Sequence, residues 1–470
     1  MLIDCACCVI METNLAYPLP SKERLTSAFV GKSLQDVPIP SAILDIAKLR
    51  KSCALMLEAV KELQVDFRAH VKTHKTTELT RIQVGQDSKD VRLVCSTIAE
   101  LENLIPLLTD YKKRGAAVNV LYGVPPGPSH IPRLARFLEK VGPGSLTLMI
   151  DGSSQLKATQ QLYELSGKST VKVFLKTDSG YHRAGLPPTS SGMQDLVDAT
   201  LTLESQGIVH LLGFYSHNSL SYGGNSPLEA MDNLRVEVEA CTQAARRNTP
   251  TDYIAKRGSC LTISCGASPT ALSLQNLLSS SPITVATNSA NALRASLAAA
   301  KEANVRFEIH AGVYPVLDMQ QVSASSRELG SHPEDTIAFT VLSEICSTYP
   351  DRTEYPEALI NAGVIALARE PCKSYRGHGV VTGWNMPDSY DSHSKEDRII
   401  VDRVSQEHGL LQWENKDKKE HLPLEYGQRI RVWPNHACIT GAHFGWYIVV
   451  DSESEHGDVV KDVWIRWRGW

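Results

Sequence analysis

The 470-residue chain contains no apolar run that approaches the roughly 20 residues needed to cross a bilayer. Its charges nearly balance, with 48 Lys and Arg against 52 Asp and Glu, which excludes both a polybasic nucleic-acid binder and a disordered acidic chain. We therefore expect neither a nucleic-acid partner nor a membrane partner. A barrel of about 250 residues plus a smaller domain fits this length.

The eleven cysteines do not indicate a disulfide scaffold, because such scaffolds belong to short secreted chains. The opening segment from Met1 to Met11 is short and acidic, whereas a secretory signal needs a basic start and a longer apolar stretch. These features predict a cytoplasmic protein with reduced thiols.

Short β-branched runs alternate with helix-period segments between residues 65 and 310. Eight strands alternating with helices predict a (β/α)8 barrel, the TIM-barrel architecture. A doubly wound open sheet is the alternative, but no GxGxxG turn follows the first strand. The expected strands are Phe67–Lys72, Val91–Ser96, Val118–Tyr122, Leu146–Ile150, Val171–Asp178, Ile208–His217, Leu261–Gly266 and Val305–His310. The expected helices are Leu101–Lys113, Ile131–Lys140, Gln155–Leu165, Met193–Ser205, Pro227–Arg247 and Ala290–Ala303.

Beyond about residue 325 the pattern changes to strands with few helical stretches, which predicts a β-rich C-terminal domain. We place an N-terminal extension at 1–40, packing on the β-domain, the barrel at 41–322 and the β-rich domain at 323–470. The expected strands of this domain are Ile337–Leu342, Ala358–Ala366, Arg398–Val401, Arg429–Val432, Gly445–Val450 and Val463–Trp467.

Lys72 ends the first barrel strand, where barrel enzymes keep their chemistry. Alternation places Arg68, His70 and Lys72 on one strand face, so Lys72 points into the polar end of the barrel. A lysine held there can have a lowered pKa and form a Schiff base. The alternative is an exposed basic strand end.

The seventh strand leads into the turn Ser264-Cys265-Gly266-Ala267-Ser268-Pro269-Thr270. Gly266 permits a close backbone approach, Ser268 can cap a helix and Pro269 suits its first position. The free N–H groups of such a helix start bind phosphate, and barrel enzymes often hold phosphate in the loops after strands seven and eight. An ordinary strand-to-helix turn is the alternative.

The fifth expected strand ends at Asp178 and is followed by Arg183, and the sixth ends at His217 and is followed by Tyr222. Together they offer a carboxylate, a guanidinium, an imidazole and a phenol near one barrel mouth. Each alone is more often structural than catalytic.

His436 and Cys438 stand two residues apart, on one face of an extended strand. An imidazole and a thiolate suit zinc. Two protein ligands leave positions for water and substrate, as a catalytic zinc requires. On its own, this short pair is more often structural.

These segments together resemble the eukaryotic D-serine dehydratases, which group with the D-threonine aldolases among the alanine-racemase-like (fold type III) pyridoxal phosphate enzymes. The resemblance runs from Val30 to Trp470. It is carried by Pro38–Asp45, Arg68–Thr76, Asp178–Gly185, Gly213–Tyr222, Ser264–Ala271, His310–Gln320, Asn361–Gly363, Glu407–Gly409, Pro434–Cys438 and Trp464–Trp470.

The resemblance implies that Lys72 is the catalytic lysine and binds pyridoxal 5'-phosphate as a Schiff base. It implies that His436 and Cys438 hold Zn2+, since D-threonine aldolases pair the histidine with an aspartate and use a harder ion. It also implies a homodimer. The implied cofactor contacts besides Lys72 are Arg183, His217, Tyr222, Ser264, Gly266, Ala267, Ser268 and Tyr314.

Three segments depart from the family pattern. Arg68-Ala69-His70 replaces Arg-Pro-His, and Ser268-Pro269-Thr270 replaces Thr-Pro-Thr while keeping a hydroxyl. The run from His217 to Tyr222 reads HNSLSY where the family has HAGHSY. That last change alters the cofactor pocket and leaves the preferred substrate open.

The implied reaction is metal-assisted β-elimination of D-serine to pyruvate and ammonia, with Lys72 removing the Cα proton. Retro-aldol cleavage of a D-β-hydroxy amino acid and dehydration of D-threo-3-hydroxyaspartate use the same parts. A non-catalytic cofactor carrier is a further alternative, although the domain bearing His436 and Cys438 argues against it. An amino-acid racemase, with Tyr314 as its second base, is the last alternative.

Overall fold

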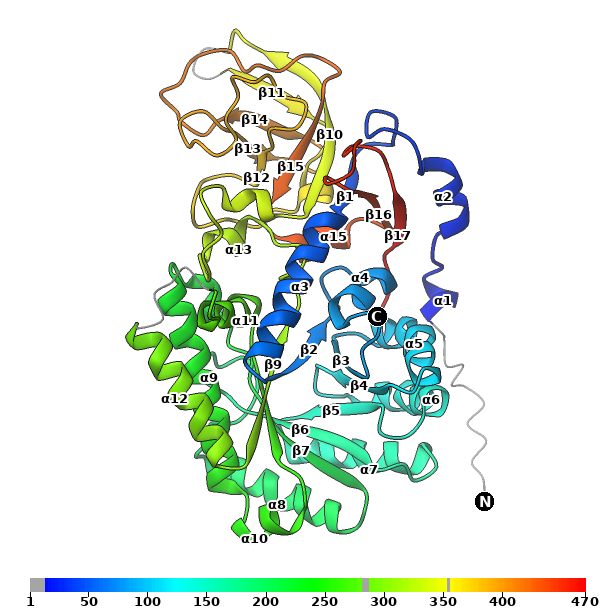
Figure 1. Ribbon diagram of the computed structural model, residues 1–470. Coiled ribbons are helices and arrows are strands. Elements are labelled where there is room, and N and C mark those ends of the chain that lie inside the picture. Colours follow the sequence, from blue (N-terminus) through cyan, green and yellow to red (C-terminus); the bar gives the residue numbers. More distant parts are fainter. Residues whose placement is uncertain (1–12, 281–286, 353–355) are drawn as a thin grey trace.

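The computed structural model describes residues 13–280, 287–352 and 356–470 (Figure 1). The acidic N-terminal segment, Met1 to Met11, lies outside these residues. The described chain forms a closed eight-stranded barrel and a separate nine-stranded sheet. Figure 1 shows the barrel with its helices in the lower half and the sheet above it. The predicted (β/α)8 barrel with a β-rich C-terminal domain is confirmed.

The barrel strands run in parallel, each pairing with the next, and the last closes on the first. They are β2 (Asp66–His70), β3 (Asp90–Cys95), β4 (Ala117–Tyr122), β5 (Leu146–Ile150), β6 (Val171–Lys176), β7 (Val209–Tyr215), β8 (Leu261–Cys265) and β9 (Val305–Ala311). All eight predicted barrel strands are therefore present, most of them shorter than expected by one or two residues at the C-terminal end.

Helices cover the outside of the barrel and several start at side-chain caps. The hydroxyls of Thr76, Thr97 and Ser226 each accept a backbone N–H from the first turn of the following helix. The helices of this part are α3 (Ile46–Glu62), α4 (Thr77–Val84), α5 (Ile98–Lys113), α6 (Ile131–Val141), α7 (Ser153–Leu165), α8 (Ser191–Ser205), α9 (Pro227–Asn248), α10 (Thr251–Lys256), α11 (Ser268–Ser273) and α12 (Asn288–Glu302).

The barrel interior contains a buried ion pair. Arg68 of β2 is 2% exposed, and its Nε lies 2.7 Å from Oε1 of Glu308 in β9. Its guanidinium also donates to Oδ1 of Asn119 at 2.9 Å. Arg68 and His70 therefore both point inward, as the alternation predicts, with His70 one layer nearer the C-terminal end.

The second sheet has the order β11-β14-β13-β12-β15-β10-β1-β16-β17. Its strands are β1 (Ser41–Asp45), β10 (Phe339–Tyr349), β11 (Glu357–Ile360), β12 (Gly379–Val381), β13 (Ile399–Val404), β14 (Gly409–Trp413), β15 (Arg429–Pro434), β16 (Trp446–Val450) and β17 (Asp462–Ile465). Its short helices are α13 (Met319–Ser323), α14 (Val364–Leu367) and α15 (Ala437–Ala442).

The N-terminal residues contact this sheet and also the barrel helices, where the Thr13 N–H donates to Oε2 of Glu102 in α5 at 3.2 Å. β1 pairs antiparallel with β10 and parallel with β16. Before it, α1 (Thr13–Ala16) and α2 (Lys22–Phe29) lead to a segment in which the Gly31 N–H donates to the Val460 carbonyl at 2.9 Å. Figure 1 shows α2 beside β17.

One predicted strand is wrong in its second half. The expected strand Ala358–Ala366 ends at Ile360, and α14 follows at Val364–Leu367. Gly363 separates them, and a Cβ there would lie 2.3 Å from the Ser405 carbonyl oxygen. The backbone therefore passes so close to its neighbour at this turn that only glycine fits.

No helix in the described part of the chain combines the length and the apolar character that a membrane span requires.

Candidate active site

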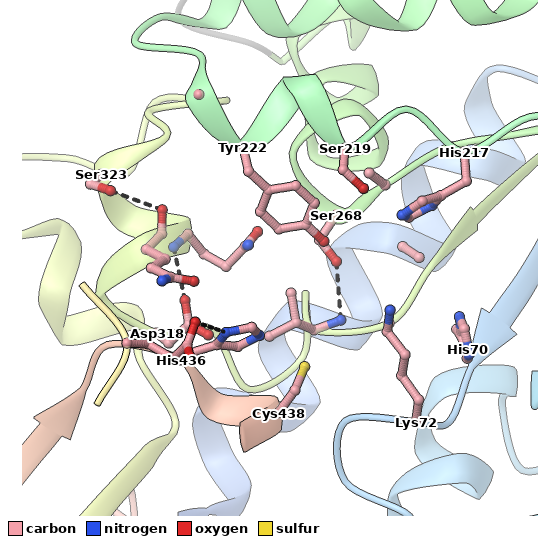
Figure 2. Close-up of a pocket in the computed structure, with 18 of the residues that line it drawn as sticks. His70, Lys72, His217, Ser219, Tyr222, Ser268, Asp318, Ser323, His436 and Cys438 are labelled. Atoms are coloured by element: carbon pink, nitrogen blue, oxygen red, sulfur yellow. Dashed lines mark hydrogen bonds and ion pairs between the residues drawn. The ribbon is translucent and has the colours of Figure 1, made fainter. Parts of the chain in front are cut away.

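A cavity of about 670 Å3 opens at the C-terminal ends of the barrel strands, where the barrel meets the β-rich domain. The side chains that line it come from both parts of the chain (Figure 2). Eight of the predicted site residues line it: Lys72, Arg183, His217, Tyr222, Ala267, Ser268, His436 and Cys438. Ser264, Gly266 and Tyr314 lie behind its wall.

Lys72 follows the end of β2, two residues after the inward-facing His70, so its amine projects into the cavity (Figure 2). The next residue, Thr73, is buried, and its Oγ1 lies 3.2 Å from Sγ of Cys438. The lysine of the barrel and the thiol of the β-rich domain are thereby held in one wall of the same site.

The loop after β8 forms another part of the wall. Gly266 has a φ of +143°, and a Cβ there would lie 2.4 Å from the His310 carbonyl oxygen, so this close approach requires glycine. The Ala267 N–H donates to Oγ1 of Thr270 at 2.7 Å, and Oγ of Ser268 accepts the Val313 N–H at 3.0 Å. These bonds fix the backbone that faces the cavity.

Tyr222 lies opposite Ser268 on the short helix η2 (Ser219–Gly223). Asn218 caps this helix, with its Oδ1 accepting the Leu220 N–H at 2.9 Å. Figure 2 shows the Tyr222 hydroxyl directed toward Ser268. Burial raises the pKa of Tyr222, so its hydroxyl stays protonated and available as a donor.

Three imidazoles line the barrel side of the cavity: His70, His217 and His310. Burial holds the pKa of each well below its ordinary value, helped by the charge of Lys72 at His70 and His217 and by those of Lys176 and Arg68 at His310, so all three are neutral at pH 7. His217 Nδ1 lies 2.6 Å from the Gly266 carbonyl oxygen and donates to it. His217 therefore joins the loop after β7 to the loop after β8.

His310 stacks on Tyr215 with ring centroids 4.3 Å apart. Its Nδ1 lies 3.1 Å from Oγ of Ser264, which places Ser264 one layer behind the cavity. Its Nε2 is buried and has no hydrogen-bond partner among the described residues. A buried polar atom beside a cavity indicates a ligand that completes its hydrogen bonding.

His436 and Cys438 enter the cavity from the β-rich domain, between the end of β15 and the first turn of α15 (Figure 2). Burial acts to lower the pKa of His436, but the Cys438 thiol and nearby carboxylates raise it to about 9. Burial also acts to raise the pKa of Cys438, and His436 holds it below its ordinary value instead. These shifts favour an imidazolium beside a thiolate at neutral pH.

Asp318 supports this pair and is absent from the sequence-based site. Its Oδ2 accepts the Ala437 N–H at 2.8 Å, and its Oδ1 accepts the Gln321 N–H at the same distance, as a cap of α13. Burial raises its pKa to about 6. The sequence signal was an aspartate directly before the helix Met319–Ser323, which indicates a cap but not a second bond across domains.

The cavity has further lining residues that the sequence did not single out. Glu370 places Oε2 3.6 Å from Nδ1 of His436. The Lys373 ammonium donates to the Gly223 carbonyl oxygen at 3.3 Å and also to that of Gly224. Neither residue lies in a motif, so the sequence carried no sign that either reaches the barrel mouth.

Arg183 lines the cavity from the loop after β6, with its guanidinium 5.4 Å from the ring centroid of Tyr181. Tyr314 differs, because it is 0% exposed and packs edge-to-face on Phe67 at 5.9 Å. Burial raises its pKa as well. Tyr314 does not line this cavity, so the structure gives no support to its role as the second base of a racemase.

The comparisons with known proteins agree with this arrangement. The family described as alanine racemase, N-terminal domain, matches residues 44–281, and the putative serine dehydratase domain matches residues 338–450. A structure of D-threo-3-hydroxyaspartate dehydratase from Delftia sp. HT23 covers 93% of the chain and is itself fully covered, with a TM-score of 0.71 and 23% identity. The protein is thus an enzyme of the alanine-racemase-like fold.

Two similar sequences define the family more narrowly. D-serine dehydratase from Schizosaccharomyces pombe is 36% identical over 453 residues, which is 96% of each chain. D-serine dehydratase from Saccharomyces cerevisiae is 32% identical over 94% of this chain and 99% of its own length. The chain belongs to the D-serine dehydratase family, a family of pyridoxal phosphate-dependent lyases, as the sequence motifs predicted.

Proposed function

We propose that this protein is a pyridoxal phosphate- and zinc-dependent D-serine ammonia-lyase, which converts D-serine to pyruvate and ammonia. The observation that carries the proposal is that Lys72, His436 and Cys438 line the same cavity. That cavity lies in a chain closely similar to two D-serine dehydratases. It provides an amine for proton transfer and a ligand pair for a Lewis acid.

Pyridoxal phosphate fits the residues present. The cavity of about 670 Å3 is within the usual range for cofactor sites, and the unpartnered Nε2 of His310 faces it. Lys72 would hold the cofactor, with Ala267, Ser268 and Tyr222 at its phosphate and Arg183 and His217 beside its ring. When bound, the cofactor supplies an electron sink for the negative charge left at Cα.

Zinc fits His436 and Cys438. The described residues contain no group of three or more His, Cys, Asp and Glu side chains arranged around a common point, so the protein would supply two ligands and leave the other positions open. A thiolate favours zinc over harder ions such as manganese. When bound, zinc supplies a Lewis acid for the departing β-hydroxyl.

The other roles in the proposed reaction belong to side chains of the protein. The Lys72 amine takes the proton from Cα of the substrate, and it projects into the cavity from the same wall as Cys438. The three neutral imidazoles add no positive charge that would repel the substrate ammonium. The phenol of Tyr222 donates toward the phosphate side.

D-threo-3-hydroxyaspartate is the second candidate substrate. It is supported by a D-threo-3-hydroxyaspartate dehydratase from Delftia sp. that is 25% identical over 93% of this chain, and by Lys373 at the cavity. However, the Lys373 ammonium is already bound by two carbonyl groups, and the Glu370 carboxylate faces the same space. A second substrate carboxylate would be repelled there, which favours D-serine.

We further propose that the protein is a cytoplasmic homodimer, which its family resemblance supports. Light scattering of the purified protein tests the dimer: a mass of twice 51.6 kDa is expected, and 51.6 kDa would contradict it.

Product analysis tests the proposed reaction. The protein, loaded with pyridoxal phosphate and zinc, is offered D-serine, D-threonine and D-threo-3-hydroxyaspartate in separate assays. Pyruvate and ammonia from D-serine, formed faster than oxaloacetate from the hydroxyaspartate, are expected. Glycine and acetaldehyde from D-threonine as the main reaction would identify an aldolase instead.

A further inference from the structure

Glu237 is a charged residue in the middle of α9 that the proposed reaction does not use. It is 0% exposed, although a helix on the outside of a barrel normally keeps its carboxylates in solvent. It does not line the cavity. It lies directly behind two loops that do.

The first loop follows β7 and carries His217 and Tyr222. Oε2 of Glu237 accepts the Asn218 N–H at 3.0 Å, and the Ser216 hydroxyl acts to lower the pKa of the carboxylate. Asn218 in turn caps the helix that holds Tyr222. The carboxylate therefore fixes the start of the segment that brings Tyr222 to the cavity.

The second loop follows β8 and carries Ala267 and Ser268. The Gly266 backbone N–H acts to lower the pKa of the Glu237 carboxylate, and Oγ1 of Thr270 donates to Oε1 at 3.5 Å. Thr270 also accepts the Ala267 N–H. Glu237 thus reaches the backbone on both sides of the place proposed for the cofactor phosphate.

A buried cation accompanies this carboxylate. Lys176, at the end of β6, is 5% exposed, and its Nζ donates to the Thr177 carbonyl oxygen at 3.2 Å. Burial raises the pKa of Glu237, and the charge of Lys176 opposes this rise. Two roles for Glu237 are therefore distinct: it holds two loops, and it balances a buried charge.

We propose that Glu237 is a positioning residue, whose carboxylate holds the loops after β7 and β8 at the spacing that the cofactor phosphate requires. The inference rests on the proposed function, because the ligand of these loops is the phosphate of pyridoxal phosphate. A carboxylate suits this position because it offers acceptor sites to several donors at once, whereas an amide presents an NH2 group to some of them.

The test is the dissociation constant of pyridoxal phosphate, measured by absorbance titration of the cofactor-free protein. Glu237→Gln keeps the shape of the side chain and should weaken binding at least ~10-fold, the effect of one lost hydrogen bond to a charged group. Glu239→Gln is the matched control, since Glu239 is an exposed carboxylate on the same helix that pairs with Arg235. It should bind as the wild type does.

A second variant separates the two roles. Glu237→Gln leaves Lys176 unbalanced, so the double variant Glu237→Gln/Lys176→Met removes both charges and restores the balance. If Glu237 holds the loops, the double variant regains thermal stability while cofactor binding stays weak. If Glu237→Gln does not fold, the double variant alone carries the test.

Wild-type affinity in the double variant would overturn the inference and leave charge balance as the role of Glu237. So would wild-type affinity in Glu237→Gln. A wild-type protein that binds no pyridoxal phosphate would overturn the proposed function and this inference with it.

Discussion

The Sγ atom of Cys438 lies 3.2 Å from the hydroxyl oxygen of Thr73, although 365 residues separate the two in sequence. Thr73 follows Lys72 at the end of a barrel strand, whereas Cys438 belongs to the β-rich domain. This contact sets the proposed zinc site beside the proposed catalytic lysine. It explains how one substrate can meet the amine at Cα and the metal at its β-hydroxyl.

Thr73→Val tests the contribution of this hydroxyl to metal binding. The substitution keeps the shape of the side chain and removes a hydrogen bond to a proposed metal ligand. Losses of such partners typically weaken metal binding by about 10-fold or more. Zinc affinity should fall by about 10-fold in a competition titration with a chelator, and Thr73→Ser should keep it. Equal affinity in Thr73→Val would show that the hydroxyl does not orient the thiol.

His436→Ala and Cys438→Ala test the zinc site itself. Each should retain pyridoxal phosphate, because neither residue is among the proposed phosphate and ring contacts, and each should lose bound zinc and at least ~100-fold in turnover. Metal analysis and pyruvate release measure the two effects. Cys346→Ala removes an exposed cysteine of the same domain and should leave both unchanged. Full turnover in Cys438→Ala would show that the reaction does not need a metal bound at this site.

Gly266→Ala tests the proposed phosphate loop. The added Cβ would lie 2.4 Å from the His310 carbonyl oxygen, at a φ that L residues rarely adopt. Strain of this kind costs about 1–3 kcal/mol, so cofactor affinity should fall roughly 10- to 100-fold. Gly192→Ala, where the nearest atom would be 3.8 Å away, is the control. An unchanged dissociation constant would place the phosphate elsewhere.

Arg68 and Glu308 predict a pH dependence of stability. Burial acts to raise the pKa of Glu308, but the charges of Arg68 and Arg92 hold it below the ordinary value of 4.5. A carboxyl with a lowered pKa stabilises the fold above that ordinary value and loses this contribution as the pH falls through the folded-state pKa. The urea midpoint of the wild type should therefore drop on acidification below about pH 4.5.

Arg68→Met tests the source of that dependence. It leaves a buried carboxylate with less compensation, so it should destabilise the protein by about 3 kcal/mol at pH 7 and flatten the acid dependence. Arg306→Met removes a 56%-exposed arginine of β9 and should change neither. A stability for Arg68→Met equal to that of the wild type at pH 7 would contradict the assigned role of the ion pair.

The sequence predicted the parts of the site that depend on local pattern. Strand alternation placed Lys72 at the barrel end. The extended strand expected at His436 and Cys438 is wrong, because β15 ends at Pro434, His436 is the N-cap of α15 and Cys438 lies in its first turn. The pairing of strands that are far apart in the chain could not be predicted from the sequence. Nothing local to Ser41–Asp45 shows that this strand pairs with β10 and β16. Asp318 was missed for the same reason, because its second hydrogen bond is to Ala437, which is distant in sequence.

The sequence also did not show which polar residues are buried. The sequence shows Glu237 as one of several charges on a long helix, and only the folded chain shows that this one is enclosed while Glu239 is exposed. The strand expected at Ala358–Ala366 failed for a related reason. Ala358 and Ile360 are buried in the strand, whereas Ile365 is 52% exposed in α14, which follows Gly363.

The most direct test measures how much ammonia and pyruvate metal-stripped protein releases from D-serine before and after zinc is restored. The account predicts no release after treatment with EDTA, and equal amounts of both products once zinc is added back to protein that still holds pyridoxal phosphate. Unchanged release without metal, or no pyruvate from D-serine in the zinc-restored protein, would contradict it.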